Sequence, residues 1–378
     1  MSKGNKNLDV FYFPFLWRGW GRAFLFFLFF PFSLSAQEFG RITLLFAGDL
    51  MQHQGQIDAA RRPDGSYDYT PCFQYVKEEV SRADVAIANL EVTLAGRPYR
   101  GYPQFSAPDE YAQAVKEAGF DVLLTANNHC LDRRQKGLER TIRVLDSLQI
   151  PSVGTYTDKS DRESRYPLII ERNGFRIALL AYTYATNGIE AQAPNIVNYI
   201  DKTQIMEDIR KARLQKADVI IACMHWGIEY RMLPEYQERQ MADWLIAQGV
   251  DHVIGGHPHV LQPMEIRPDD YTAARHVVVY SLGNYISNMS APNTDGGAML
   301  KLELKRIGHI TALADCSYSL VWTSRPSLRG GGNYLLYPAA NPPEGITPEE
   351  KSRLSTFLQK ARNLFKKNNI DIKEYFFK

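Results

Sequence analysis

Six short apolar runs recur along the chain, and a polar fragment follows each of them at once. Their residues are mostly aliphatic or β-branched and show no polar alternation, which is typical of strands that are buried on both faces. The runs cover residues 42–47, 85–88, 122–124, 219–224, 250–254 and 277–280. We therefore predict a buried sheet whose strands are contributed by most of the chain.

The segments between these runs carry helical signals, so strand and helix alternate from residue 41 to about residue 286. Prolines open several of the segments and glycines close them, as is usual at helix ends. Helices are expected from Thr70-Pro71, with Phe73, Val76 and Val80 inward, from Pro108 to Gly119, through Leu138, Ile142, Leu145 and Leu148, and from Pro234 to Gly249. Two further strands, 167–171 and 175–182, flank Asn173-Gly174, the usual sequence of a tight hairpin turn. This alternation implies a layered α/β fold.

After residue 284 the pattern changes. Residues 298–305 and 309–319 predict late, partly exposed strands, and the glycines at 330–332 indicate a break. A final helix begins at the capping box Thr347-Pro348-Glu349-Glu350 and carries one apolar stripe: Leu354, Phe357, Leu358, Ala361, Leu364 and Phe365. We expect this stripe to dock on the main domain, with contact to a membrane or a partner as the alternative.

The first 36 residues have the features of a secretory signal. Four basic residues precede an apolar stretch at 23–34, and Ser35-Ala36-Gln37 provides a cleavage point after Ala36. An uncleaved membrane anchor is the alternative, although the stretch is shorter than the roughly 20 residues of a full span. We therefore expect a signal peptide at 1–36, a main domain at 37–310 and a C-terminal extension with an amphipathic helix at 311–378. The protein is expected in the periplasm or cell envelope, and it contacts a membrane only if the signal stays uncleaved.

The charge of the chain narrows the choice of binding partner. The chain has 44 Lys and Arg against 42 Asp and Glu; the predicted signal holds four basic residues and one acidic, which leaves 40 basic against 41 acidic. No basic stripe remains to bind nucleic acid, and Arg133-Arg134 locally favours an anionic substrate.

The cysteines at 72, 130, 223 and 316 show no CxxC spacing. We expect buried free thiols, although an oxidising compartment permits disulfides.

The polar fragments after the apolar runs gather residue types that bind metals. They are Gly48-Asp49-Leu50-Met51, Asn89-Leu90-Glu91, Ala126-Asn127-Asn128-His129, His225-Trp226-Gly227, Gly256-His257-Pro258-His259 and Ser281-Leu282-Gly283-Asn284. Parallel sheets bind ligands at the carboxyl ends of their strands, so we expect these fragments on one rim. Carboxylate, amide and imidazole groups together suit a hard or borderline divalent metal pair. The histidines at 53, 252, 276 and 309 are expected to be structural.

These motifs, in this order, resemble the capsule synthesis protein CapA family, the poly-γ-glutamate capsule group, which belongs in fold with the calcineurin-like metallophosphoesterases. The resemblance extends over residues 42–286 and includes Gly119-Phe120-Asp121-Val122, Glu229-Tyr230 and Gln262. It implies a layered αββα sandwich with a C-terminal helical extension and one or two divalent metal ions, Mn, Zn or Fe. The implied metal ligands are Asp49, Glu91, Asn128, His225, His257 and His259.

The resemblance also implies roles for individual residues. In the phosphoesterase pattern the bridging carboxylate comes from the second strand, which is Glu91 here. The Asn of the Asn-His pair is a ligand, while the adjacent His, here His129, meets the substrate and donates a proton or stabilises charge. Asp132 can hold the His129 ring, with capping of the following helix as its alternative role. His129 and Asp132 are thus the candidate catalytic pair.

One position departs from the phosphoesterase pattern. Those enzymes usually carry Asp-x-His at the first strand, whereas this chain has Asp49-Leu50-Met51. A thioether is a poor ligand for a hard ion, so a first metal site would consist of Asp49, Glu91 and His259 and would be open or weak. The resemblance to the CapA family includes this Met.

Two functions are consistent with these residues. The first is an exported metal-dependent hydrolase that acts in the synthesis or processing of poly-γ-glutamate capsule or another envelope polymer. The second is a non-catalytic envelope factor that binds an anionic polymer and assists its synthesis or export. The expected partners are an anionic polymer or a small acidic substrate, together with envelope biosynthesis machinery and no nucleic acid. Met51 favours the second function, and the Asn128-His129 pair favours the first.

Overall fold

The computed structural model of the protein describes residues 38–269 and 272–377, so the predicted signal peptide lies outside the described residues. These residues belong to one unit, Gln37–Lys378. All four cysteines in it are buried free thiols, as expected. None of the helices that the structure describes is long and apolar enough to cross a membrane.

The larger sheet of the described residues has nine strands in the order β16-β15-β14-β1-β2-β3-β4, with β13 paired to β1 and β17 to β15. The strands β1 to β4 run parallel and correspond in part to the apolar runs of the sequence. The long strands β14 and β15 extend the sheet beside β1 in the antiparallel sense. The bounds are β1 Glu38–Leu50, β2 Val85–Leu90, β3 Val122–Leu124, β4 Ser152–Val153, β13 Asn284–Ile286, β14 Gly296–Ile307, β15 Ile310–Ser324, β16 Leu335–Pro338 and β17 Lys373–Glu374.

The second sheet has six strands within the described residues, in the order β11-β12-β10-β9-β7-β6. The strands β12, β10, β9 and β7 are parallel, and the hairpin of β6 and β7 turns at Asn173 and Gly174 with φ of 51° and 79°, as expected from the sequence. Its strands are β6 Leu168–Arg172, β7 Phe175–Thr183, β9 Val219–His225, β10 His252–Gly256, β11 Met264–Pro268 and β12 Arg275–Val279. A separate ribbon pairs β5 Thr155–Tyr156 with β8 Ile196–Val197.

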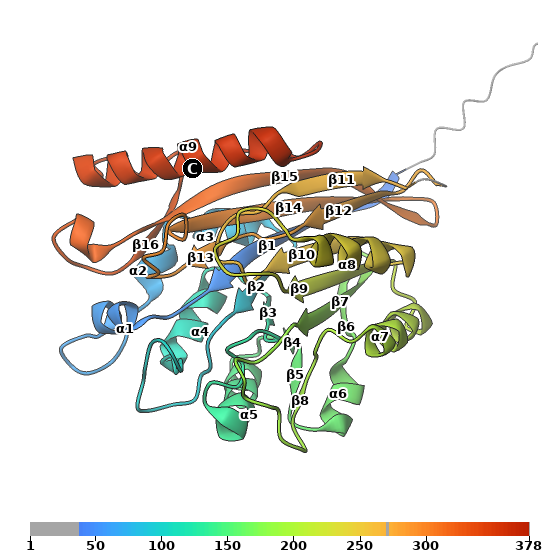
Figure 1. Ribbon diagram of the computed structural model, residues 1–378, viewed down its shortest axis with the longest axis horizontal. Coiled ribbons are helices and arrows are strands. Elements are labelled where there is room, and N and C mark those ends of the chain that lie inside the picture. The colour runs from blue at the N-terminus through green and yellow to red at the C-terminus, as the bar shows by residue number, and fades with distance from the viewer. Residues whose placement is uncertain (1–37, 270–271, 378) are drawn as a thin grey trace, which may run out of the picture. The chain divides into compact units, whose positions relative to one another are not determined.

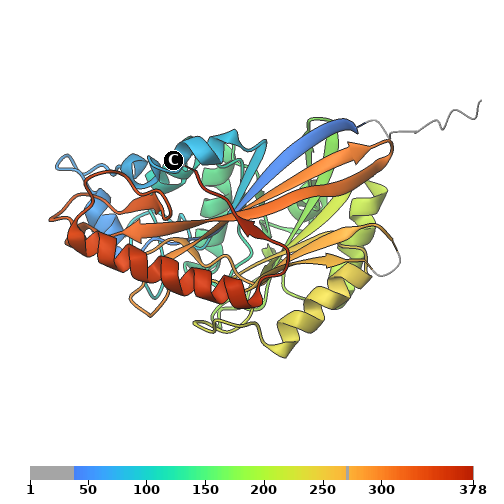
Figure 2. The same ribbon diagram turned by 90° about the horizontal axis from the view of Figure 1, so that it is seen from above.

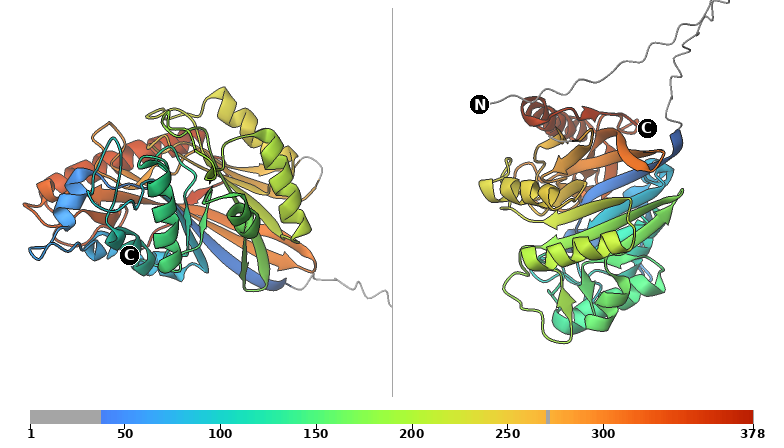
Figure 3. Two further views of the ribbon diagram at one scale, coloured as in Figure 1. Left: turned by 90° about the horizontal axis from the view of Figure 1, so that it is seen from below. Right: turned by 90° about the vertical axis from the view of Figure 1, so that its right-hand side faces the viewer.

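Alternate residues of β1 face two different cores. Leu44 and Phe46 pack in one apolar core with Leu179 of the six-stranded sheet. Leu45 and Ala47 belong to a second core that includes residues of the helices α2 to α5. The two sheets therefore pack face to face, with α4 (Asp109–Glu117) and α5 (Arg134–Ser147) outside one sheet and α7 (Lys202–Leu214) and α8 (Tyr236–Ala247) outside the other (Figures 1 and 3). The predicted αββα sandwich is confirmed.

The predicted helices are present, although one of them is split, and three further helices, α1 Gln54–Ala60, α6 Lys159–Arg165 and α7 Lys202–Leu214, were not predicted. The helix expected from Thr70 is split into α2 and α3, and α7 was not predicted because Asp208 interrupts its buried face between Ile205, Ile209 and Ala212. Asp208 is buried there because it pairs with Arg162 at 2.7 Å. The helices are α1 Gln54–Ala60, α2 Thr70–Phe73, α3 Lys77–Arg82, α4 Asp109–Glu117, α5 Arg134–Ser147, α6 Lys159–Arg165, α7 Lys202–Leu214, α8 Tyr236–Ala247, the short 3-10 turn η1 Pro326–Leu328, and α9 Pro348–Asn368.

The C-terminal segment is built into the same unit. Strand β15 begins at Ile310 and pairs along its length with β14, so the sheet continues across residues 310 and 311. Helix α9 starts with the expected capping box, in which the Thr347 hydroxyl accepts from Glu350 N at 3.1 Å. Its apolar stripe docks on the sheet sandwich, as predicted, with Leu354, Phe357, Ala361 and Phe365 buried and Leu358 and Leu364 partly buried. Figure 2 shows α9 crossing the long strands.

Candidate metal centre

The predicted ligands lie at the carboxyl ends of strands from both sheets. Asp49 is near the end of β1 and Glu91 directly follows β2 in the nine-stranded sheet. In the six-stranded sheet, His225 ends β9, and His257 and His259 follow β10. All five residues are at most 4% exposed. Each sheet therefore supplies part of one buried cluster.

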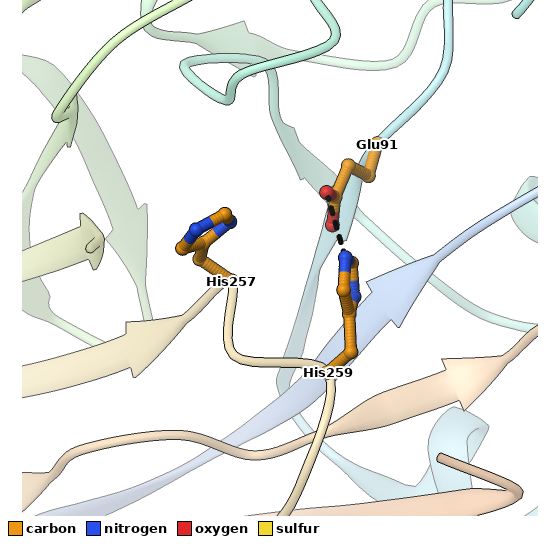
Figure 4. A group of neighbouring side chains, drawn as sticks. All are labelled: Glu91, His257 and His259. Carbon is orange, nitrogen blue, oxygen red and sulfur yellow. Dashed lines mark ion pairs between the residues drawn. The ribbon is translucent and has the colours of Figure 1, made fainter. Parts of the chain in front are cut away.

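Close backbone approaches fix the positions of these residues. A Cβ added at Gly48 would lie 1.9 Å from Gly283 O, the same atom to which Asp49 N donates at 3.0 Å. Only glycine allows this approach of β1 to the turn before β13. His257 and His259 both have positive φ, 100° and 59°, which is uncommon for residues with a side chain. Figure 4 shows that the resulting loop brings both imidazoles beside Glu91.

Glu91, from the nine-stranded sheet, lies beside two histidines of the six-stranded sheet. Its Oε1 is 3.6 Å from His225 Nε2 and 3.7 Å from His259 Nε2, the second of these pairs being drawn in Figure 4. Two groups have their ligand atoms within 4.8 Å of one another: Glu91 with His257 and His259, and Asp49 with Glu91 and His225. Glu91 is shared by both groups, which is the arrangement that a bridging carboxylate requires.

The grouping of ligands differs in detail from the set suggested by the sequence. Asp49, expected beside Glu91 and His259, also forms a group with His225. The expected contact exists as well, since His259 Nδ1 lies 3.4 Å from Asp49 Oδ2. The same Nδ1 is 3.0 Å from Asn284 Oδ1, a carbonyl oxygen that can only accept. This bond fixes the ring so that Nε2 is the nitrogen beside Glu91.

The electrostatics of the cluster suit a bound cation. Burial, and then the neighbouring Asp49 carboxylate, raise the pKa of Glu91 well above its usual value. Burial, and then neighbouring imidazoles, lower the pKa of His225 well below its usual value and that of His257 to about 3, so both rings are neutral. Glu91 Oε1 and His257 Nδ1 are buried and have no hydrogen-bond partner in the described part of the chain. A divalent cation would satisfy these two atoms and offset the repulsion between the carboxylates.

Asn89 was not predicted as a site residue, although it lies in the same fragment as Glu91. Its amide nitrogen donates to Asp49 Oδ1 at 2.8 Å and to Glu91 Oε2 at 3.3 Å, and lies 3.4 Å from His225 Nδ1. Asn127 in turn donates to Asn89 Oδ1 at 3.1 Å and so fixes which way the amide points. An Asn two residues before a predicted ligand was the available signal. The sequence alone did not single out Asn89, because its partners Asp49, Glu91 and His225 come from the ends of three different strands.

The side chains of Asn128 and His129 have different partners. Asn128 Oδ1 lies 3.0 Å from His225 Nε2, which places the amide oxygen at the cluster. His129 Nδ1 donates to Asp132 Oδ2 at 2.8 Å, and the same oxygen accepts from Phe105 N at 2.8 Å. Burial raises the pKa of Asp132, while the His129 bond opposes that rise. The alternative role of Asp132 as a helix cap is wrong, because the N-cap position of α5 is Arg133 and α5 has no side-chain capping bond.

Met51 and His53 lie just after the end of β1. Met51, at the position of the missing His, is 2% exposed and packs in the apolar core under the helices. His53 was expected to be structural, and its Nδ1 does accept from Asn288 N at 3.3 Å. Its ring nevertheless packs edge-on against Phe105, whose ring is 4.6 Å from that of His129. Burial lowers the pKa of His53 to about 4.

Comparison with known proteins agrees with the sequence resemblance. The family model described as bacterial capsule synthesis protein PGA_cap matches residues 43–289. The capsule biosynthesis protein CapA of Bacillus anthracis is 27% identical over 291 residues, 74% of this chain and 67% of that protein. The PGA biosynthesis protein CapA of Bacillus subtilis is 28% identical over 273 residues, 70% of this chain and 68% of that protein. Among solved structures, the calcineurin-like phosphoesterase YfkN from Bacillus subtilis has a TM-score of 0.44 at 15% identity, covering 86% of this chain and 100% of its own.

Proposed function

Because the chain belongs to the bacterial capsule synthesis protein family PGA_cap, we propose that it is an exported, metal-dependent hydrolase that acts on poly-γ-glutamate or another acidic polymer of the cell envelope. The names of its two Bacillus relatives refer to capsule and PGA biosynthesis, which supports the choice of polymer. The predicted signal at residues 1–36 supports export.

The observation that carries the proposal is the unpartnered, buried Glu91 oxygen between His225 and His259. An unpaired buried carboxylate is costly, and a protein retains one where a ligand compensates for it. The imidazoles of His225 and His259, on both sides of Glu91, each carry a nitrogen that can bind a metal. Carboxylate oxygens and imidazole nitrogens of this kind fit Mn²⁺, Zn²⁺ or Fe²⁺.

The residues that would hold the metal are Asp49, Glu91, Asn128, His225, His257 and His259. When bound, a divalent metal supplies Lewis-acid polarisation of an acyl or phosphoryl oxygen and activates water at neutral pH. Asn89 orients the two carboxylates, because one amide group donates to both of them. Asn284 orients the His259 ring in the same way.

His129 is the residue that moves a proton in this proposal. Its Nδ1–H is held by Asp132, so a proton delivered to the leaving group would come from Nε2–H of the imidazolium, which becomes a neutral imidazole. Asp132 acts as a positioning residue, and Phe105 N holds the carboxylate from the other side. The edge-on Phe105 ring restricts rotation of the imidazole.

A second candidate function is supported by one observation. Met51 is buried in the apolar core where phosphoesterases usually provide an imidazole, which removes a ligand from the first metal position. A half-filled centre would suit a non-catalytic envelope factor that binds an anionic polymer and assists its synthesis or export. In that case, the polymer binds without turnover at any metal loading.

Metal content decides between the two functions. We would measure it by elemental analysis of the purified protein after loading with manganese, zinc or iron, for wild type and for the double variant His257→Ala with His259→Ala. About two equivalents in wild type that are lost in the variant, together with hydrolysis of phosphoesters or γ-glutamyl polymers, support the hydrolase. Absence of metal after loading would contradict it and favour the binding factor.

A further inference from the structure

A cavity lies between helix α9 and the loop that joins β13 to β14, residues 287–295. Its volume is about 270 Å³, and none of the proposed metal ligands lines it. Helix α9 contributes residues 352, 353, 356, 357 and 360, which lie on one face of a helix because they recur every three to four residues. The 287–295 loop and the end of β15 contribute most of the other walls. The cavity is therefore separate from the metal centre.

The side chains around this cavity are mostly basic where they are charged. The described residues that line it include Arg325, Arg353 and Lys360, and one acid, Asp295. The Asp295 carboxylate already accepts an indole N–H at 3.0 Å, and Arg353 pairs with Glu349 at 2.9 Å. Arg325 and Lys360 form no ion pair within the described part of the chain. The cavity therefore carries an excess of positive charge and attracts an anion.

Two buried oxygens of the lining residues have no hydrogen-bond partner among the described residues. They are Thr323 Oγ1 and Asn293 Oδ1, and Thr323 is only 2% exposed. An unpaired buried polar atom is costly, so a bound molecule that pairs with it is favoured. The Thr323 hydroxyl can donate to an anion, whereas the Asn293 carbonyl oxygen can only accept. A ligand that satisfies both atoms carries an acceptor and a donor close together.

The 287–295 loop also supports the metal centre. The Arg325 guanidinium donates to Met289 O in this loop. Asn284 Nδ2 donates to Thr294 O at 3.0 Å, while Asn284 Oδ1 lies 3.0 Å from His259 Nδ1. The same loop therefore borders the cavity and is bonded to the residue that orients a proposed metal ligand.

An acidic, peptide-linked unit has the chemistry that this cavity would recognise. Its carboxylate can accept from the basic side chains and from the Thr323 hydroxyl, and its amide N–H can donate to Asn293 Oδ1. We propose that the cavity is a subsite for one carboxylate-bearing unit of an acidic, peptide-linked polymer. The identity of the polymer rests on the proposed function, and the subsite adds a second point at which the protein holds it.

The size of the cavity limits how much of a polymer it holds. A volume of about 270 Å³ lies at the lower end of the range for ligand sites. It suits a single unit rather than a longer segment. A divalent cation at the metal centre would add positive charge to the protein, so it would act in the same direction as the basic residues of the cavity. The contribution of the cavity is therefore isolated by comparing variants at equal metal loading.

The test measures how tightly the purified protein binds a short, fluorescently labelled γ-glutamyl oligomer, by anisotropy at neutral pH. It is carried out in chelator, where no metal-dependent turnover occurs, and again after loading with manganese. Lys360→Gln, at an exposed position, is expected to weaken binding about threefold. Thr323→Val, which replaces the hydroxyl with a methyl group, is expected to weaken it about tenfold. Lys366→Gln, exposed on the same helix but outside the cavity, is the charge-matched control and should bind like wild type.

Weaker binding in Lys360→Gln and Thr323→Val but not in Lys366→Gln, by the same factor with and without manganese, supports the subsite. Equal binding by wild type and all three variants would overturn it, as would no binding to wild type at millimolar concentration. Inorganic phosphate that displaces the oligomer when present at the same concentration would assign the cavity to a free anion, and would overturn it too.

These outcomes are distinct from those that decide the hydrolase. The binding measured in chelator needs neither metal nor turnover, so the subsite can be supported even if the protein hydrolyses nothing. Conversely, loss of the subsite in the variants would leave metal content unchanged, because none of the proposed metal ligands lines the cavity.

Discussion

At the scale of single residues, the candidate metal centre contains a buried carboxyl group that destabilises the folded protein in the absence of metal. Glu91 is fully buried beside Asp49, and its Oε1 has no partner in the described part of the chain. Burial and like charge both disfavour its ionised form, as the raised pKa shows. The metal-free site is therefore expected to destabilise the folded protein rather than to contribute to folding.

Glu91→Gln is expected to stabilise the metal-free protein by about 1–2 kcal/mol, because it removes an ionisable group whose charge is penalised in the folded state. The same change should abolish metal binding. Urea unfolding in the presence of a chelator measures the first effect, and elemental analysis the second. Glu190→Gln should change neither. A less stable Glu91→Gln protein would contradict the penalty inferred from burial.

His129→Gln is expected to lower hydrolysis by at least about 100-fold, the usual contribution of a positioned proton donor. Metal content should be unchanged, because His129 bonds to Asp132 and belongs to neither ligand group. Initial rates and elemental analysis are measured on the same preparation. His309→Gln, on an exposed turn, is the control. Unchanged rates in His129→Gln would remove the residue from the mechanism.

At the scale of elements, the candidate metal centre depends on strands of both sheets whose carboxyl ends lie at the same edge of the sandwich. Strand β9 pairs with β10 so that His225 lies opposite Gly256, directly before the loop with His257 and His259. In the other sheet, β1 pairs with β2 so that Asp49 lies opposite Asn89. The register of two strand pairs therefore sets the geometry of the cluster, since a slip by one residue would turn each ligand away.

Helix α9 shows how a late element stabilises the sandwich. Phe357 is 5% exposed, and its ring occupies the space where a Cβ on Gly296 of β14 would lie, 2.6 Å from Phe357 Cζ. Phe357→Ala is expected to cost about 3–5 kcal/mol of unfolding free energy. Gln359→Ala, on the exposed face of the same helix, should cost less than about 0.5 kcal/mol. Denaturant unfolding compares the two, and equal small losses would show that α9 does not support the core.

At the scale of the whole molecule, buried neutral histidines make folding dependent on pH. Burial lowers the pKa of His252, like that of His257, to about 3. An unfolded chain protonates these residues near pH 6.5, but the folded protein does not. Each such residue therefore stabilises the folded state less as pH falls below about 6.5, and this loss continues down to the folded pKa.

His252 lies away from the metal centre and allows this effect to be isolated, since its Nδ1 accepts from Val277 N at 3.1 Å. In His252→Asn the amide oxygen can accept the same bond without titrating. Between pH 7.5 and pH 5.5, wild type should lose about 1 kcal/mol more stability than the variant. Urea unfolding at both pH values checks the difference, and parallel losses would contradict the lowered pKa.

The proposed export concerns the full chain, and removal of the predicted signal would change the mass of the protein. If residues 1–36 are removed on secretion, the secreted protein begins at Gln37. Intact-mass measurement of protein recovered from a secreting host should therefore give the mass of residues 37–378. The full-length mass in a membrane fraction would instead show an uncleaved anchor.

The elements of the fold could largely be predicted from local patterns. Apolar runs gave the strands, Asn173-Gly174 gave the hairpin, and Thr347 with Glu350 gave the start of α9. Each of these patterns can be recognised in the sequence because it depends only on residues that are close together along the chain. Helix α7 was not predicted, because a charged residue, Asp208, lies on its buried face. Asp208 is paired there with Arg162, a residue 46 positions away.

The sequence by itself determined which residue types follow each strand, since the chemistry of Asp49, Glu91 and the histidines is fixed by their identity. The resemblance implied that Glu91 bridges, and the structure places Glu91 in both ligand groups. Only the tertiary structure decided that His225 joins Asp49 and Glu91 in one group, and that Asn89 donates to both carboxylates. These facts depend on the packing of one sheet against the other and on the register of distant strands. No local pattern carries that information, because the side chains involved meet across the two sheets.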